Sequence, residues 1–302
     1  ADPTGYYSER GRDLLRGVKP FTPPEVYDLA FDLASERAEA EAWMRSTFLL
    51  PPETDLTGLG PLSTDPRLQR GTEFWRLGLY SQARADFESL RVSFEDDPAN
   101  TYRLANYLVD LGLYRSAILA ARRVLTLAGM DDAATMNAPI YFNYLRFGTY
   151  FSDLILPAAQ AYRLDPLLLF AVVRQESFFE GFANSSAGAR GLMQIIPSTG
   201  QGIANNAGWP PNYNADDLYR PVVSITFGAD YLRAQLNNLD SDLYAALAAY
   251  NGGPGNAAQW KKLSNGDPDL FLEVVRFDET RRYVRSIYEI YAIYCRIYNR
   301  TP

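Results

Sequence analysis

Histidine is absent from this chain of 302 residues, and cysteine occurs once, as Cys295. Without histidine the chain has no Ser-His or Cys-His nucleophile and no imidazole metal site. A single cysteine also excludes an internal disulfide framework and a thiolate zinc site. We therefore expect any chemistry to use carboxylates, hydroxyls, amides or lysine, with no metal and no cofactor.

Long apolar runs are scarce as well. The longest strongly apolar run, Leu167 to Val173, is far shorter than the roughly 20 residues that cross a bilayer, so we expect no membrane span. The chain begins at Ala1 rather than Met and carries no basic-then-apolar leader, so we expect a processed or trimmed form of something longer.

Basic side chains are in the minority, 29 against 36 acidic ones, which gives a net charge of −7. Because phosphate neutralisation needs clustered Lys and Arg, nucleic acid and anionic membrane surfaces are disfavoured as partners. Apolar residues make up 47% and charged residues 22% of the chain, as in folded globular proteins. At roughly 150 residues per domain, we expect about two domains.

The first part of the chain predicts helices. Residues 24–49 place apolar side chains at i, i+3 and i+4 between charged ones, the pattern of one long amphipathic helix. Residues 51–66 are rich in proline and glycine, which predicts a loop.

An internal repeat follows. Three residues recur 34 positions later, in the pairs Gly78 and Gly112, Tyr80 and Tyr114, and Ala83 and Ala117. This period resembles the tetratricopeptide repeat, a helical hairpin. We expect glycine where the chain turns and a Cβ would crowd, and alanine where the second helix approaches the first. The repeat predicts a packing scaffold, and a groove for a protein partner is the alternative.

The composition changes near residues 130–150, where we place a boundary between a scaffold domain, 1–140, and a second domain, 141–302. Residues 191–215 carry no charged side chain but many amides and aromatic rings. Amides bind hydroxyl and acetamido groups, and rings cover apolar sugar faces, so this segment predicts a groove for an uncharged polar ligand. A long ordered loop with exposed amides is the alternative.

One glutamate of the second domain lies among apolar residues. A helix is predicted from Asp165 to Phe179, with the aspartate as its cap and a proline in its first turn. Glu176 lies near the end of this helix, with Val172 and Val173 one turn away. Loss of solvation around a carboxylate raises its pKa, which suits a general acid. A solvated or Arg-paired surface glutamate is the alternative.

Three motifs include or follow this glutamate. They are Arg174-Gln175-Glu176-Ser177-x(7)-Ser185-x-x-Gly188-Ala189-x-Gly191-Leu192-Met193-Gln194-x-x-Pro197-x-Thr199, then Ala248-Ala249-Tyr250-Asn251-x-Gly253-Pro254-Gly255, then Glu273-x(3)-Phe277-x-Glu279-Thr280-Arg281-x-Tyr283-Val284. In this order, over about residues 150–295, they resemble the goose-type-lysozyme-like soluble lytic transglycosylases of bacteria. The larger members of that family carry an N-terminal helical superhelix before such a domain, which fits the predicted repeat.

The resemblance implies a reaction and a set of site residues. Family members cleave the β-1,4 bond between N-acetylmuramic acid and N-acetylglucosamine in peptidoglycan, with one glutamate as acid and then base; Glu176 matches that position. The resemblance also implies five substrate-binding residues: Ser185 near the reacting sugar, Met193 and Gln194 along the groove, and the pair Tyr250 and Asn251, whose phenol reaches towards the glutamate.

The acidic residues bear on the mechanism. Ordinary glycosidases use two carboxylates, but no acidic residue lies between Glu180 and Asp216. The more distant acids that could fold inward are Asp230, Asp242, Glu273 and Glu279. We expect substrate assistance instead. Glu176 protonates the glycosidic oxygen, the 2-acetamido group stabilises the sugar cation, and Glu176 then deprotonates the C6 hydroxyl to give a 1,6-anhydromuramyl end.

A stripe of apolar and aromatic residues near the C-terminus has helical spacing. It predicts a core helix whose tyrosine hydroxyls point to the rim, and its members are Tyr283, Ile287, Ile290, Tyr291, Tyr294 and Ile297. Cys295 in this helix is predicted to be an inert buried thiol.

We therefore expect an all-α protein, in which a superhelical repeat module precedes a lysozyme-like helical catalytic domain. A short β-hairpin near residues 205–220 is compatible with this architecture. The predicted function is a peptidoglycan lytic transglycosylase that acts on glycan strands in the bacterial cell envelope, on the periplasmic or cell-wall side. A hydrolytic lysozyme on the same fold and a non-catalytic scaffold that binds peptidoglycan or protein are the alternatives.

Overall fold

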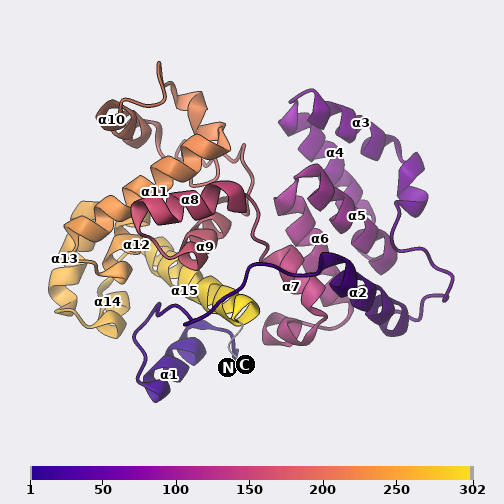
Figure 1. Ribbon diagram of the computed structural model, residues 1–302, viewed down its shortest axis with the longest axis horizontal. Helices are drawn as coiled ribbons and strands as arrows, with labels where there is room; N and C mark the ends of the chain where they lie inside the picture. Colours follow the sequence, from indigo (N-terminus) through magenta and orange to yellow (C-terminus); the bar gives the residue numbers. More distant parts are fainter. Residues whose placement is uncertain (1, 300–302) are drawn as a thin grey trace. The chain divides into compact units, whose positions relative to one another are not determined.

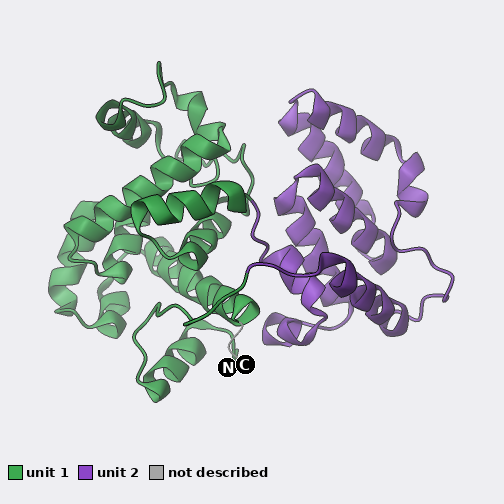
Figure 2. Cartoon of the chain, viewed as in Figure 1, with its two compact units in different colours: residues 1–28, 151–302 green, residues 29–150 purple. Residues whose placement is uncertain are grey.

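The computed structural model describes residues 2–299, whose regular elements are helices (Figure 1). The β pairings within these residues are isolated bridges, so the predicted all-α class is confirmed. None of the described helices has the length and apolarity that a membrane crossing requires. The chain divides into two compact units, a repeat unit of residues 29–150 and a second unit of residues 1–28 and 151–302 (Figure 2).

These units differ from the predicted domains 1–140 and 141–302 in two places. Residues 1–28 belong to the second unit, because the first helix, α1 (Tyr6–Arg16), packs on the last one. The stretch that follows residue 140 stays with the repeat unit as far as Tyr150, because α7 (Ile140–Arg146) buries aromatic side chains in that unit's core.

The repeat unit is built from short helices, and the first of them packs on the last. They are α2 (Leu33–Thr47), the 3₁₀ turn η1 (Gly60–Thr64), α3 (Pro66–Arg76), α4 (Tyr80–Ser93), α5 (Pro98–Leu111), α6 (Tyr114–Leu127), the 3₁₀ turn η2 (Asp132–Asn137) and α7. The helices α3 and α4 form one hairpin, and α5 and α6 form the next. Apart from η1 and the start of α3, residues 51–66 are irregular, as predicted.

Glycine marks the turn of each hairpin, for a reason other than the expected one. Gly78 and Gly112 have φ values of 74° and 87°, a left-handed conformation that glycine adopts without strain. A Cβ at Gly78 would meet no described atom within 4 Å, and at Gly112 the nearest atom would be 3.9 Å away. Backbone conformation, not crowding, therefore selects glycine. Ala83 and Ala117 are fully buried, as the close approach of the helices requires.

The helix predicted over residues 24–49 is too long. The helix α2 begins only at Leu33, where the Asp32 side chain accepts hydrogen bonds from two backbone N–H groups. Before it, the N–H of Asp28 donates to the carbonyl of Tyr298 near the end of the chain. This pairing uses the backbone of Asp28 outside a helix, and the residues between it and α2 form no regular element.

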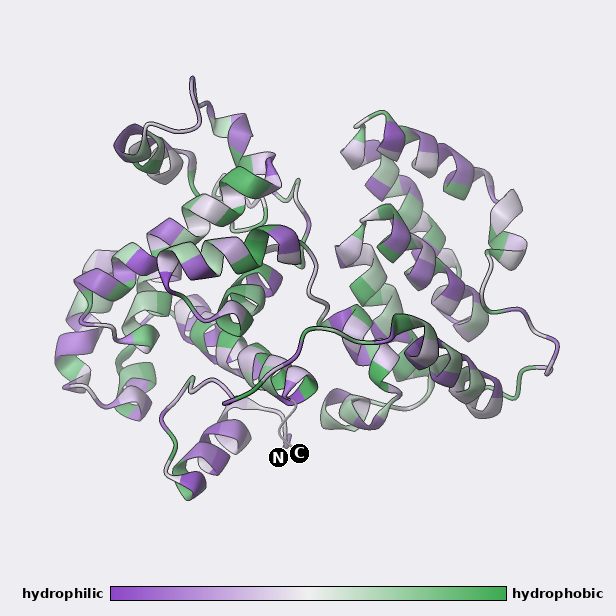
Figure 3. Cartoon of the chain, in the orientation of Figure 1, coloured by the Kyte–Doolittle hydropathy of each residue, from purple (hydrophilic) through white to green (hydrophobic). Residues whose placement is uncertain are grey.

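The second unit consists of the N-terminal helix α1 and the helices after residue 150. These are α8 (Ser152–Tyr162), α9 (Pro166–Ser177), α10 (Pro197–Ala207), the 3₁₀ turn η3 (Ala215–Tyr219), α11 (Pro221–Asn238), α12 (Leu243–Gly252), α13 (Pro254–Ser264), α14 (Pro268–Val274) and α15 (Asp278–Tyr298). Most helices carry both hydrophobic and hydrophilic residues (Figure 3). The hairpin considered near residues 205–220 is absent, since the end of α10 and η3 occupy that stretch.

The core of the second unit lies where α15 packs on α9 and α12. Every residue from Leu167 to Val173 in α9 is buried. The predicted stripe on α15 is buried as well, and its Tyr294 ring stacks on Phe170 with centroids 5.9 Å apart. This arrangement brings the end of α9 against the beginning of α15, where the candidate site lies.

Candidate active site

Glu176 lies in the last turn of α9. The helix starts at Pro166, with the Asp165 carboxylate accepting a hydrogen bond from the N–H of Leu167. It ends at Ser177, two residues earlier than predicted, because Phe178 adopts a left-handed φ of 51°. The end of α9 thus fixes the position of the glutamate against the core.

Burial dominates the electrostatics of Glu176. The loss of solvation raises the pKa of its carboxyl from 4.5 to about 8. One hydrogen bond acts in the opposite direction, because the phenol of Tyr283 donates to Oε1 and favours the anion. With a pKa of about 8 the carboxyl is largely protonated at neutral pH, which is the state that a general acid needs.

Tyr283 is the residue that the sequence did not single out for the site. It lies one turn into α15 and is 6% exposed, which confirms that it is buried. Its hydroxyl, however, does not point to the rim as expected but to Glu176. Burial and the nearby Glu176 charge raise the pKa of Tyr283 well above 10, so its phenol stays a donor. The sequence feature that could have assigned Tyr283 to the site is its position in the third motif.

The loop after α9 is held by hydroxyl groups from three helices. Ser177 of α9 donates to the carbonyl of Leu192 at 2.9 Å. Ser224 of α11 accepts from the N–H of Met193 at 3.0 Å, and the phenol of Tyr250 in α12 donates to the Met193 carbonyl at 2.7 Å. Met193 is fully buried. The structure therefore joins two of the predicted site residues, Met193 and Tyr250, through the loop backbone.

Tyr250 contacts the loop rather than the glutamate. The resemblance implied a phenol that reaches towards Glu176, and in the structure Tyr283 makes that hydrogen bond. Tyr250 is still close to the acid, because the charge of Glu176 contributes to raising the pKa of Tyr250 well above 10. Its neighbour Asn251 accepts a hydrogen bond from Thr280 of α15 at 2.6 Å.

Gln194 and Ser185 shape the same loop. Gln194 has a left-handed φ of 47°, and its side-chain amide donates to the carbonyls of Gly191 and Ala183 at 2.8 and 3.2 Å. Ser185 is exposed, and its hydroxyl accepts from the N–H of Ala189 at 3.0 Å. Neither side chain hydrogen-bonds Glu176 in the described residues, so their structural role is to fold the loop.

Four further acids were considered as a second carboxylate, and none of them affects the pKa of Glu176. Asp230 lies near Tyr162 of α8, whose pKa is raised by burial and, to a smaller extent, by the Asp230 charge. Asp242 accepts from the backbone at the start of α12, Glu273 pairs with Arg285 at 3.2 Å, and Glu279 is exposed. Within residues 2–299, Glu176 is thus a carboxyl without a carboxylate partner. Those residues also contain no cluster of three or more potential metal ligands.

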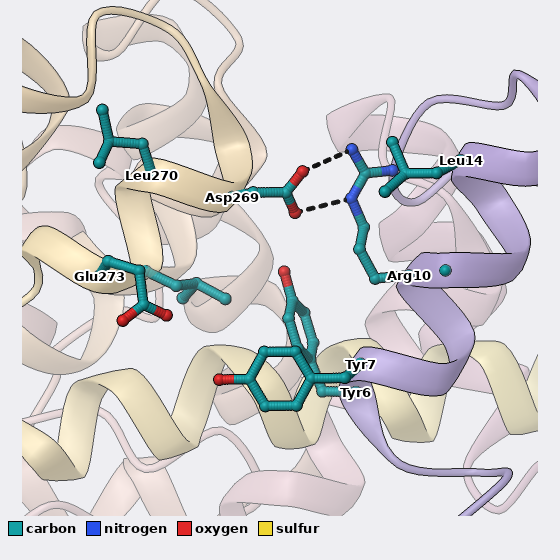
Figure 4. A pocket seen from close by; sticks show the side chains of 9 residues that line it. Tyr6, Tyr7, Arg10, Leu14, Asp269, Leu270 and Glu273 are labelled. Carbon is teal, nitrogen blue, oxygen red and sulfur yellow. Dashed lines mark hydrogen bonds and ion pairs between the residues drawn. The ribbon is translucent and has the colours of Figure 1, made fainter.

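A pocket of about 560 Å³ lies elsewhere in the second unit, between α1 and α14 (Figure 4). Arg10 pairs with both carboxylate oxygens of Asp269 at 2.8 and 3.0 Å, and the Tyr6 phenol points towards them. None of the predicted site residues lines this pocket. Its ion pair and apolar walls attach α1 to the unit that contains Glu176.

Fold and site together define a lysozyme-like helical domain built around one desolvated glutamate. Residues 153–269 match the family model described as Transglycosylase SLT domain. This segment thus resembles the transglycosylase SLT family, in agreement with the resemblance that the sequence motifs indicate.

Relatives and a solved structure agree with this assignment. The chain is 29% identical over 236 residues to the soluble lytic murein transglycosylase of Escherichia coli, a match that covers 77% of this chain and 34% of that protein. It is 32% identical over 151 residues to the soluble lytic murein transglycosylase of Salmonella typhimurium, covering 49% of this chain and 23% of that protein. An inactive mutant of lytic transglycosylase Slt from Pseudomonas aeruginosa has a TM-score of 0.66 and 26% identity, covering 97% of this chain and 41% of that chain. The chain thus spans about a third or less of the length of the two curated relatives.

Proposed function

We propose that the chain cleaves the β-1,4 bond between N-acetylmuramic acid and N-acetylglucosamine in peptidoglycan without consuming water. The observation that carries this proposal is the state of Glu176, whose carboxyl is desolvated and bound by one phenol, and whose pKa is not affected by any other carboxylate. The names of the relatives support peptidoglycan, or murein, as the substrate.

The first step uses Glu176 as an acid. Its protonated carboxyl transfers the proton to the glycosidic oxygen, and the bond from that oxygen to C1 of the muramyl sugar breaks. The carboxyl becomes an anion in a desolvated place, where the hydrogen bond from Tyr283 stabilises it. The 2-acetamido group of the same sugar stabilises the positive charge at C1, which replaces the missing second carboxylate.

The second step uses Glu176 as a base. The carboxylate takes the proton of the C6 hydroxyl, and O6 bonds to C1 to give the 1,6-anhydro sugar. A carboxylate with a raised pKa accepts a proton more readily than an ordinary one, so the same burial serves both steps. The proton returns to Glu176, and the enzyme ends in its starting state.

The remaining predicted residues are assigned to the glycan groove. Ser185, on the exposed part of the loop, and Asn251 supply polar groups to the sugars. Met193, Gln194 and Tyr250 are assigned to the wall of the groove. This role is supported by the hydrogen bond from Tyr250 to the Met193 carbonyl and by those from Gln194 to the carbonyls of Gly191 and Ala183. We assign the activity to the bacterial cell envelope, on the periplasmic or cell-wall side, and a scaffold role with a possible protein partner to the repeat unit.

The substitution Glu176→Gln tests the proposal, because it keeps the shape of the side chain and removes the transferable proton. We expect the release of soluble products from purified peptidoglycan to fall about a hundredfold or more, the scale of general acid–base catalysis. The matched control is Glu279→Gln, which changes an exposed carboxyl of α15. Wild-type turnover by Glu176→Gln would refute the assignment.

A further inference from the structure

The beginning of α15 contacts two of the predicted site helices. Tyr283 donates to Glu176 of α9, and Thr280, one turn earlier, donates to Oδ1 of Asn251 at the end of α12. Thr280 is 1% exposed, so its hydroxyl is shielded from water. We propose that Thr280 is a positioning residue that orients the side-chain amide of Asn251 towards the glycan; this inference rests on the proposed function.

The packing of α12 on α15 fixes the distance between the two side chains. Thr280 Oγ1 and Asn251 Oδ1 are 2.6 Å apart, a short hydrogen bond. A Cβ at the adjacent Gly252 would lie 2.7 Å from Thr280 Oγ1, so only glycine lets the end of α12 come this close. The hydroxyl therefore lies opposite the amide in a fixed place.

The hydrogen bond from Thr280 determines which group of the Asn251 side-chain amide can bind a ligand. An amide has one accepting oxygen and a nitrogen with two N–H donors. Because the oxygen of Asn251 accepts from Thr280, its nitrogen is left to donate elsewhere, and no hydrogen bond joins it to another of residues 2–299. Asn251 is exposed. The site thus presents N–H donors to a ligand.

N–H donors select an acceptor oxygen. In the proposed glycan substrate the strongest neutral acceptors are the carbonyl oxygens of the acetamido groups, so Asn251 binds one of these. With the amide reversed, its own carbonyl would face the acetamido carbonyl, and two acceptors repel each other. Thr280 therefore contributes to substrate binding through Asn251, without contact to the acid.

Tyr283 provides the contrast that makes the role of Thr280 measurable. Tyr283 influences the pKa of Glu176, whereas Thr280 does not. Loss of the Thr280 hydroxyl should therefore weaken substrate binding and leave the pH dependence unchanged. A merely structural defect would instead lower thermal stability and kcat together.

The experiment is a double-mutant cycle with peptidoglycan turnover as the readout. Thr280→Val keeps the side-chain shape and removes the hydroxyl. We expect KM to rise about three- to tenfold, which corresponds to the loss of one hydrogen bond. The value of kcat and the alkaline limb of the pH profile should not change. Thr280→Ser restores the donor and should return KM to near the wild-type value. In an Asn251→Ala background, Thr280→Val should have no further effect.

Other outcomes overturn the inference. A wild-type KM in Thr280→Val, equal defects in Thr280→Val and Thr280→Ser, a shifted pH profile, or additive effects with Asn251→Ala would each contradict it. Failure of the proposed function is seen separately, as wild-type protein that releases no anhydro products. In that case, the affinity for oligomers of N-acetylglucosamine, compared between wild type and Thr280→Val, still decides whether Thr280 orients a binding group, and equal or absent binding refutes it.

Discussion

At the scale of residues, the centre of the candidate site is the hydrogen bond from Tyr283 to Glu176. The position of Glu176 near the end of an apolar helix could be predicted from sequence, and so could its raised pKa, because both depend on neighbours along the same helix. The role of Tyr283 could not. Helical spacing predicts that a tyrosine is buried, but the direction of its hydroxyl depends on which helix packs against it. The same limit applies to Tyr250, whose phenol donates to the Met193 carbonyl while the Glu176 charge still contributes, after burial, to raising its pKa.

Replacing Tyr283 by phenylalanine should move the pH profile in a definite direction. The phenol stabilises the Glu176 anion, so its loss raises the pKa of Glu176 further above about 8. Since the acid must be protonated, the alkaline limb of kcat/KM should shift upwards by about one pH unit, the worth of a charge-assisted hydrogen bond. Tyr250→Phe is the control, because its phenol donates to Met193. A limb that stays in place in Tyr283→Phe would contradict the hydrogen bond's role.

Glu176 should also make the protein less stable at high pH. Its pKa is raised in the folded state, so the folded state binds more protons between pH 4.5 and about 8, and stability falls as the pH rises through that window. Glutamine carries no charge to desolvate. We therefore expect Glu176→Gln to gain stability over wild type by a few kcal/mol at pH 8 and by much less at pH 5, as measured by urea unfolding. An equal difference at both pH values would argue against a desolvated carboxyl.

At the scale of elements, the position of the loop between α9 and α10 depends on the helices that pack against it. Hydroxyls from α9, α11 and α12 hold Leu192 and Met193 in place. The sequence predicted the helices α9 and α15 well, because their apolar residues repeat at helical spacing. It failed before α2, where pairing of Asp28 with Tyr298 overrides local periodicity. Contacts between distant segments leave no periodic signal.

Two glycine substitutions test the contact between α11 and the loop. A Cβ at Gly228 would lie 2.5 Å from Met193 Cβ, whereas a Cβ at Gly202 of α10 would meet nothing within 4 Å. We expect Gly228→Ala to lose about 1–3 kcal/mol of unfolding free energy through overpacking. Gly202→Ala should gain up to about 1 kcal/mol, since alanine favours a helix. Denaturant unfolding measures both, and a gain in Gly228→Ala would show that Met193 is not held there.

At the scale of the whole molecule, the N-terminal segment belongs to the unit that carries the acid. The Tyr6 ring is 5% exposed, and its phenol lies 3.1 Å from that of Tyr244. Along the sequence, residues 29–150 of the repeat unit lie between this segment and the rest of its unit. A change of composition along the sequence can indicate a domain boundary. It cannot show that two segments far apart in the sequence fold into the same unit.

Adjacent tyrosines in α1 offer a matched test of this organisation. Tyr6→Ala should cost about 3 kcal/mol or more, because it leaves a cavity under α1. Tyr7→Ala should cost about 1 kcal/mol or less, because Tyr7 is 67% exposed and contributes one cation–π contact with Arg285. The temperature at which activity is lost reports the stability of the unit that contains Glu176. Equal losses in the two variants would contradict the assignment of α1 to that unit.

The most direct test of a single-carboxyl, water-free cleavage is the fate of the solvent oxygen. Purified peptidoglycan is digested in water enriched in the heavy oxygen isotope, and the released fragments are weighed by mass spectrometry, with Glu176→Gln as the blank. Water-free cleavage by Glu176 should give 1,6-anhydromuramyl ends that contain no heavy oxygen. Reducing ends that carry the heavy isotope would show hydrolysis and contradict it.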